Sequence, residues 1–559
     1  LNYRFNKDFN VGATWMRMME RPVTQKVDCG SEPYKNNVIG FDINYRTELP
    51  FLTKFIDLLP VLSTKEKSYM SFKGEFAHLI PGTPKAISKD GISYVDDFEG
   101  SQSTIDLRTQ SAWRIASTPQ GQNDLFPEGS SKSLNNGFKR SKIAWYLIDP
   151  LFYQSNNLTP QHIKDDPSQL YDSRMRQVLQ TDIFPNQQLT YGSIPTIQIL
   201  ELGYYPKERG MYNYDTTATV NADGTFSNPQ DRWGGIMRSL TTNDFEQANV
   251  EFIQFWILDP FNADAMAAAP GLTGGDLYFN LGNVSEDVLA DSRKSFENGI
   301  PPYAGANYPV VITPWAKVST QQVVVNAFDN DPNSRVNQDV GIDGYTSSEE
   351  QTSYTNYVNW VQNNGTLTPE AKAKMISDPS NDDYNFYRDD VYDQEQLNIL
   401  QRYKKYNGME GNSATTEMSS NMNPNGGGYP TQARNTPDLE DINQDNNLSE
   451  SEAYFQYKVS LRPSDMVVGK NYITSVVTYT PKNSNKVEKW YQFKVPIKEP
   501  EKAVNGIRDF RSIRFFRMFM RGFDEEVIVR FAKLELVRGE WRKYLLDLQS
   551  PGEDRKSVV

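Results

Sequence analysis

The chain has 559 residues and a net charge of −13, from 71 acidic and 58 basic side chains. This acidic balance argues against a nucleic-acid partner. The single cysteine, Cys29, excludes an internal disulfide framework and a zinc cluster, and two histidines, His78 and His162, leave little for histidine-based catalysis. No P-loop, G-x-S-x-G or dinucleotide-binding fingerprint occurs, so we expect the chain not to be an enzyme.

Residues 1–82 alternate apolar and polar side chains. In IGFDINYR (39–46) every second residue is apolar, and the segments 9–15 and 70–77 repeat this pattern. Segments of about ten residues with one apolar and one polar face are typical of transmembrane β-barrels. A soluble antiparallel sheet with one solvated face gives the same alternation, and the pattern alone favours that soluble sheet. Between these strands, FLTKFIDLLPVL (51–62) predicts a short amphipathic helix.

The rest of the chain is predicted to form jelly-roll-like β-sandwich lobes with one insertion. The strands SKIAWYLIDPLF and VEFIQFWILDPF both run from aromatic residues into an Asp-Pro turn, which suggests a duplicated unit. We expect a first lobe at 83–226, the first half of a second lobe at 227–319, and its return half at 456–559. Residues 320–455 combine helical patterns with Asn/Gly/Ser-rich loops, which predicts a partly helical insertion.

The insertion contains a candidate calcium loop. DINQDNNLSESE (441–452) carries oxygen-bearing side chains at the spacing of an EF-hand-type loop, in which alternate positions supply ligands and position twelve supplies two oxygens. Asn446 stands where such a loop has glycine, and asparagine tolerates the left-handed conformation needed there. The alternative interpretation is a solvated acidic loop that caps a helix. The candidate ligands are Asp441, Asn443, Asp445, Asn447, Ser449 and Glu452.

A second, less complete version of this loop is DVGIDGYTSSEE (339–350). Asp339, Asp343 and Glu350 hold positions one, five and twelve, so they are the candidate calcium ligands here. Gly341 at position three offers no side-chain ligand. The spacing therefore predicts a second calcium site with fewer side-chain ligands than the first.

A further acidic group opens the segment YVDDFEGSQSTIDL (94–107). Asp96, Asp97 and Glu99 raise the possibility of a pair of catalytic carboxylates, which glycosidases place on opposite sides of a cleft. We favour ion binding or hydrogen bonding to the backbone at the start of a strand. No catalytic residue is predicted.

Five segments occur in the same order as signature segments of a known family, which the chain resembles over essentially its whole length. They are residues 94–107, 279–301, 338–350, 401–413 and 436–452. The family is SprA/Sov, the giant outer-membrane translocons of the type IX secretion system in Bacteroidetes, some of which are tied to gliding motility. Its members are several times longer, so we expect the chain to be an internal piece of a larger protein.

The resemblance implies a mainly β protein of the cell outer membrane. Residues 1–82 would be transmembrane β-barrel strands with an interfacial helix. The resemblance thus overrules the interpretation of these residues as a soluble sheet. The lobes would lie in the periplasm or outside the cell. The implied function is export of folded cargo through a wet lumen. The implied partners are secreted cargo proteins with C-terminal signal domains, a smaller outer-membrane barrel that collects cargo, a periplasmic plug protein and outer-membrane lipid, with no nucleic acid.

Two other functions stay open. A carbohydrate-binding jelly-roll surface protein would need an exposed aromatic platform, such as Trp113, Trp145 or Trp233, which we interpret instead as core residues. A TonB-dependent-type outer-membrane transporter would need an N-terminal plug domain, which this sequence does not show.

Overall fold

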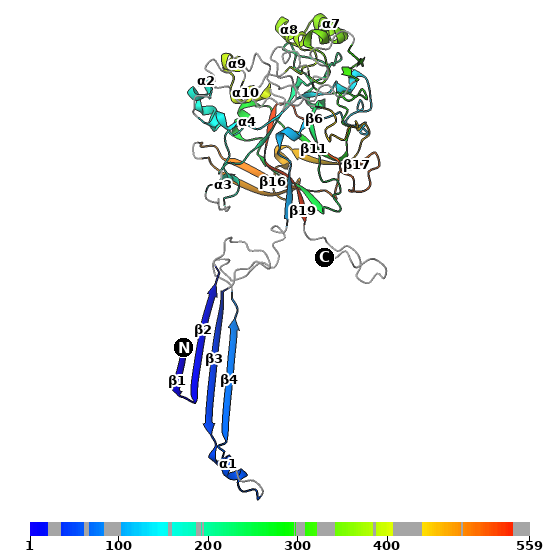
Figure 1. The fold of residues 1–559 in the computed structure, drawn as a ribbon. Coiled ribbons are helices and arrows are strands. Elements are labelled where there is room, and N and C mark those ends of the chain that lie inside the picture. Colours follow the sequence, from blue (N-terminus) through cyan, green and yellow to red (C-terminus); the bar gives the residue numbers. More distant parts are fainter. Residues whose placement is uncertain are drawn as a thin grey trace. The chain divides into compact units, whose positions relative to one another are not determined.

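The chain is described here from a computed structural model. The described residues are 1–20, 35–60, 66–82, 102–154, 159–185, 192, 195–295, 297, 308–320, 341–383, 387–388, 390–405, 439–481 and 484–539. They divide into two compact units, the first formed by Leu1–Ser103 with Gly539–Val559 and the second by Thr104–Arg538. Both units contain antiparallel β-sheets (Figure 1), so the prediction of a mainly β fold is confirmed.

The first unit contains a four-stranded antiparallel sheet in the order β1-β2-β3-β4, whose strands lie side by side in Figure 1. Aromatic and β-branched residues favour these strands because their side chains suit a pleated surface. A proline at the first helical position favours the helix after β3, since the N–H that proline lacks would have no partner there. The elements are β1 (Asn2–Asn6), β2 (Phe9–Met19), β3 (Lys35–Glu48), α1 (Pro50–Ile56) and β4 (Tyr69–Ile80).

The strand register gives this sheet one apolar and one polar face. Phe41 of β3 lies opposite Ala13 of β2 and Phe76 of β4. Asp42, one residue further, lies opposite Glu75 on the other face, because successive side chains of a strand point to opposite sides. The side chains of Phe41 and Phe76 are 53% and 59% exposed. Within the first unit, no described helix or strand covers these two side chains of the apolar face.

The second unit contains two large sheets. The first is seven-stranded, and β5 (Gln102–Asp106) joins it beside β19. Its other strands, in order, are β15 (Ile473–Tyr479), β16 (Glu488–Pro496), β10 (Val250–Leu258), β19 (Val527–Gly539), β8 (Leu200–Arg209) and β7 (Ser141–Tyr146). The second sheet has the order β17 (Lys502–Val504), β14 (Ala453–Leu461), β11 (Gly275–Asn283), β18 (Phe515–Arg521), β9 (Trp233–Ser239) and β6 (Arg114–Ile115).

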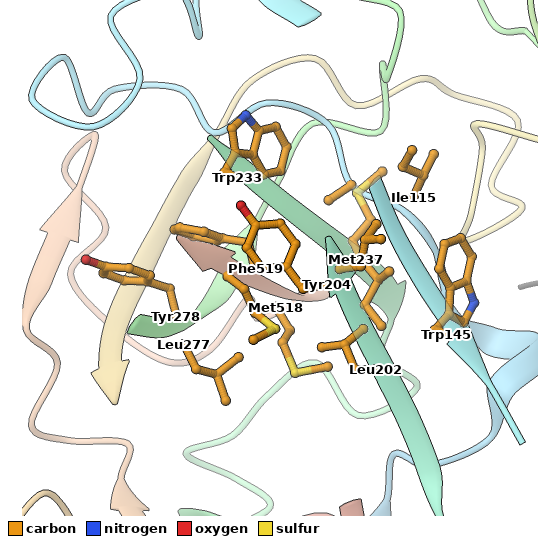
Figure 2. Packing of buried hydrophobic residues seen from close by; sticks show 14 of the residues in the cluster. Ile115, Trp145, Leu202, Tyr204, Trp233, Met237, Leu277, Tyr278, Met518 and Phe519 are labelled. Carbon is orange, nitrogen blue, oxygen red and sulfur yellow. The ribbon is translucent and has the colours of Figure 1, made fainter. Parts of the chain in front are cut away.

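These two sheets pack face to face around one aromatic core. Phe255 of β10 contacts Phe279 of β11 in the other sheet, with ring centroids 5.4 Å apart. Figure 2 shows the same arrangement further along the core, where Trp145 and Tyr204 of the first sheet lie in one cluster with Trp233 of the second. The unit is therefore a β-sandwich, stabilised mainly by removing this apolar surface from water.

The two lobes expected from the sequence do not match the sheets of the structure. Residues 83–226 were expected to form one lobe, and 227–319 with 456–559 another. Strands β7 and β8 from the first range instead share a sheet with β10, β16 and β19 from the second. The physical reason is burial: Trp145, Leu202 and Tyr204 on β7 and β8 are covered by the opposite sheet, in which every strand except β6 comes from residues after 226.

The two Asp-Pro sequences end their strands in the same way. After β7, Oδ1 of Asp149 accepts a hydrogen bond from the backbone N of Leu151 at 2.9 Å. After β10, Oδ1 of Asp259 accepts one from the backbone N of Phe261 at 3.0 Å. The prediction of a turn at each Asp-Pro is therefore confirmed, and both turns use the aspartate side chain in place of a backbone acceptor.

The helices of the second unit are short, and several lie between residues 320 and 455. None of the described helices is long and apolar enough to cross a membrane. A small hairpin, β12 (Val310–Ile312) with β13 (Lys317–Ser319), precedes them. The α-helices are α2 (Gln161–Asp165), α3 (Gln180–Ile183), α4 (Ala263–Ala268), α6 (Ser347–Ser353), α7 (Thr355–Asn363), α8 (Pro369–Ser377), α9 (Asp390–Gln394) and α10 (Ile399–Lys404). The 3₁₀ turns are Gln110–Ala112, Leu134–Gly137, Pro150–Tyr153, Pro167–Tyr171, Pro229–Asp231 and Pro463–Asp465.

Candidate metal centre

The less complete acidic loop leads directly into helix α6. Gly344, at position six, has φ +70°, the left-handed conformation that a sharp turn requires there. Thr346 then caps the helix: its side chain accepts from the backbone N of Glu349, whose carboxylate accepts in return from the backbone N of Thr346 at 3.1 Å. Glu350, at position twelve, falls in the first turn of α6. This loop followed by a helix is the local structure that an EF-hand-type loop has in its second half.

The fold brings a third carboxylate to this loop. Asp343, Glu350 and Asp382 each place a carboxylate oxygen within 4.8 Å of the other two. Asp382 lies in the segment that follows α8. All three residues are buried, with exposed fractions of 0%, 2% and 4%. Three acidic groups from two distant segments therefore converge inside the protein.

The hydrogen bonds around the cluster leave a buried oxygen of Asp382 without a partner among the described residues. Oδ2 of Asp343 accepts from Oγ of Ser380 at 2.7 Å and from the hydroxyl of Tyr354 at 3.1 Å. Oε2 of Glu350 accepts from the backbone N of Ser380 at 2.9 Å. Oδ2 of Asp382 is buried and has no hydrogen-bond partner among the described residues. This atom lacks the partner that buried polar atoms normally have.

Gly341 forms one wall of the cluster. Its φ is +66°, and a Cβ atom at this position would lie 2.0 Å from Oδ2 of Asp382. Any side chain here would therefore displace the carboxylate. Glycine at position three, which offers no ligand of its own, makes room for the carboxylate of Asp382 instead.

The cluster is electrostatically unbalanced. Within the described parts of the chain, none of the three carboxylates forms an ion pair, and Arg209 donates to the backbone carbonyl of Asp378 at 2.8 Å rather than to them. Burial raises the pKa of Asp343 to about 7, and burial together with neighbouring carboxylates raises the pKa of Glu350 to about 9. Burial and the charges of Glu350 and Asp343 also raise the pKa of Asp382 well above its ordinary value.

The loop 441–452 has a different internal structure. Asn446 has φ +67°, so asparagine does adopt the left-handed conformation predicted for position six. Oδ1 and Oδ2 of Asp441 accept from the backbone N of Asp445 at 3.1 Å and of Asn446 at 2.9 Å. Oδ1 of Asn443 and Oδ1 of Asp445 accept from backbone N–H groups two residues further on. The candidate ligands at positions one, three and five thus hold the turn together.

Basic side chains neutralise this loop from within the protein. Arg517 donates to both carboxylate oxygens of Glu452, at 3.0 Å for the Nη2–Oε2 pair, and both side chains are fully buried. Arg514 donates to Oδ2 of Asp445 at 2.6 Å and to Oγ of Ser449 at 3.2 Å. The carboxylate of Glu452 at position twelve therefore already has a guanidinium partner, and Asn447 donates from its backbone N and from Nδ2 to Asp445.

Some of the predicted site residues are not among the residues that the structure describes. Asp339 and the acidic group at 96–99 lie outside the described residues. Sequence reasoning missed Asp382, although the run DPSNDD (378–383) was a signal, because three acids within six residues are unusual next to a helix end.

The tryptophans considered as a glycan platform are core residues. Trp113, Trp145 and Trp233 are all buried, and Trp145 and Trp233 lie inside the cluster of Figure 2. Their interpretation as core residues is confirmed. A carbohydrate-binding surface would have to use other side chains.

Comparison with known protein families gives a match over the C-terminal part of the chain. Residues 356–558 match the family model SprA_N, described as a motility-related/secretion protein. No curated protein matches the chain. The matched range starts in α7 and includes Asp382, the loop 441–452 and the sandwich strands from β14 to β19. Over residues 356–558 the chain is thus similar to a family of motility-related and secretion proteins, which supports the resemblance to SprA/Sov.

Proposed function

We propose that this chain is part of an outer-membrane channel that exports folded cargo proteins through the type IX secretion system and so supports surface display and gliding motility. The observation that carries the proposal is the exposed apolar face of the sheet β1–β4. The match of residues 356–558 to a motility-related and secretion family supports it independently. The proposed role needs no covalent chemistry, and no catalytic residue is assigned.

The lengths of the strands support a membrane-spanning role. Strands β2, β3 and β4 have 11, 14 and 12 residues. A tilted strand needs about 9–11 residues to cross the hydrocarbon core of a bilayer. Typical strands of soluble proteins have about 5–6 residues, which is too short for that distance. The three strands are thus long enough to cross a bilayer.

The side chains on the two faces of the sheet suit contact with lipid on one side and with water on the other. Trp15, Phe41 and Phe76 are exposed on the apolar face, with 72% of Trp15 accessible. Each Å² of apolar surface left in water costs about 25 cal/mol, so lipid contact over this face is strongly favourable. Asp42 and Glu75 on the opposite face suit a wet lumen.

The ends of the strands carry residues that suit the membrane interface. Arg46 lies over the ring of Tyr69, 4.5 Å from its centroid. Helix α1 exposes Phe51 and Phe55 next to this end of the sheet, as an amphipathic helix at a bilayer surface would. The sandwich of the second unit would then be an extramembrane lobe in the periplasm or outside the cell.

The proposed channel acts on other proteins. Its partners would be cargo with C-terminal signal domains, a smaller outer-membrane barrel that collects the cargo, and a periplasmic plug protein. Outer-membrane lipid would cover the apolar face of β1–β4. The acidic composition remains an argument against a nucleic-acid partner.

The proposal is tested by deleting the parent gene in the cell that makes the protein. Mass spectrometry then locates the proteins that carry type IX C-terminal signals. We expect them to accumulate in the periplasm and to disappear from the cell surface and the medium. Unchanged secretion, with a loss of glycan binding or of nutrient uptake instead, would overturn the proposal in favour of a surface-binding protein or a transporter.

A further inference from the structure

We propose that Asp343, Glu350 and Asp382 bind one calcium ion, which links the start of helix α6 to the segment after α8. This site is separate from the channel proposal, because all its residues lie in the second unit and none belongs to the sheet β1–β4. It would remain if the proposed export function failed.

The spacing of the carboxylates fits a single ion. Calcium is held by oxygen atoms at about 2.3–2.6 Å, so two ligands on opposite sides of the ion lie a little under or over 5 Å apart. The three carboxylates place one oxygen each within 4.8 Å of the others. One ion can therefore contact Asp343, Glu350 and Asp382 at the same time.

The unpartnered oxygen of Asp382 points to a missing ligand. Asp382 is 96% buried, since only 4% of it is exposed, and its Oδ2 accepts no hydrogen bond from any described residue. Gly341 leaves the space that this carboxylate needs. Because an isolated buried charge is costly, a cation is the partner that satisfies this atom and both neighbouring carboxylates.

The chemistry of the cluster selects the class of metal. All the available ligands are oxygen atoms, which suit calcium or magnesium and not zinc or other metals that prefer nitrogen and sulfur. Magnesium usually keeps several bound waters, whereas these three side chains are almost fully buried. Glu350 at position twelve can supply two oxygens, as the glutamate of an EF-hand loop does. Calcium therefore fits best.

Binding is measured on the full chain after removal of divalent ions with EGTA and exchange into EGTA-free buffer. Calorimetric titration with Ca²⁺ should give one site. Terbium, which replaces calcium, should show sensitised emission, because the hydroxyl of Tyr354 lies 3.1 Å from Oδ2 of Asp343. In Asp382→Asn and Glu350→Gln the affinity for Ca²⁺ should fall at least about tenfold.

Asp445→Asn is the matched control, because it removes an acid from the loop that arginines already neutralise. Its affinity for Ca²⁺ should equal that of the unchanged chain. Three results would each overturn the proposal: no binding to the unchanged chain, unchanged binding in Asp382→Asn and Glu350→Gln, or loss of binding in Asp445→Asn.

Thermal unfolding separates ligand binding from a structural role. Without Ca²⁺, Asp382→Asn should unfold at no lower a temperature than the unchanged chain, since it removes a buried acid whose charged form is costly in the absence of a cation. With Ca²⁺, the unchanged chain should gain several degrees and the variant should gain nothing. A variant that is less stable without Ca²⁺, yet still stabilised by it, would contradict a calcium ligand at Asp382.

Discussion

Strand β3 of the first unit and strand β10 of the sandwich carry similar apolar residues in different surroundings. Phe41 of β3 is 53% exposed, although strands pair with β3 on both sides. Phe255 of β10 is fully buried, stacked on Phe493 of its own sheet and packed on Phe279 of the other. Alternation along a strand thus determines which face is apolar, whereas the layer that covers this face depends on the rest of the molecule or on lipid.

The largest expected difference is in the stability of the sandwich. Phe255→Ala should lower the free energy of unfolding of the second unit by about 3–5 kcal/mol, because it opens a cavity in a packed core. Phe41→Ala should leave that free energy unchanged within about 0.5 kcal/mol. Urea unfolding followed by tryptophan fluorescence measures both. Similar losses in the two variants would contradict the contrast between the two strands.

Charged residues extend the comparison. Arg517 is buried with Glu452, so Arg517→Met should cost about 3–5 kcal/mol by leaving a buried carboxylate without its partner. Adding Glu452→Gln should recover part of this loss, since the unpaired charge is then removed. Asp42→Asn, on the exposed polar face of β3, is the control and should be nearly neutral in the same unfolding measurement. An Arg517→Met variant as stable as the control would show that the buried pair contributes little.

A charge on the apolar face of β3 tests the proposed lipid contact. Phe41→Lys should cost about 2–4 kcal/mol of membrane insertion if the residue lies near the middle of the bilayer. Asn44→Lys, on the opposite face of the same strand, should be tolerated because it would face water. Export of signal-bearing proteins, measured by mass spectrometry of the medium, should fall only in Phe41→Lys. Equal export in the two variants would contradict the assignment of the faces.

The smallest expected effect concerns an exposed ion pair. The side chains of Arg514 and Asp445 are 32% and 38% exposed, so water screens the attraction between their charges. Arg514→Met should therefore change the free energy of unfolding by at most about 1 kcal/mol. Comparison with Arg517→Met in the same urea series separates a buried from an exposed arginine, both of which contact the loop 441–452. A loss as large as that of Arg517→Met would indicate that the exposed pair is not screened.

Much of the secondary structure could be predicted from local pattern. The alternation at 39–46 lies within β3, and the helical stripe at 51–62 overlaps α1. The arrangement of the sandwich could not be predicted, because its strand partners are distant in sequence. Strand β10 pairs with β16 and β19, which come more than two hundred residues later. Periodicity within a strand carries no information about such partners.

The candidate site shows the same limit at the level of single residues. The spacing within 339–350 identified Asp343 and Glu350, which do converge. It could not identify Asp382, which arrives from beyond α8. In the loop 441–452 the spacing matched better, but Arg517 reaches Glu452 from a strand 65 residues further along. The spacing within a loop indicates which oxygen atoms can lie close together. Only the folded structure shows which basic side chains already neutralise them.

The most direct test of the account is the environment of the two faces of β3. Phe41→Cys and Asn44→Cys are made in a Cys29→Ser background, which removes the chain's natural cysteine. Isolated outer membranes are treated with a charged, water-soluble thiol reagent or with a lipid-soluble maleimide. If the apolar face of β3 meets lipid, the charged reagent modifies the cysteine at 44 and only the lipid-soluble reagent modifies the cysteine at 41. Equal modification of both positions by the charged reagent would contradict a lipid-facing sheet.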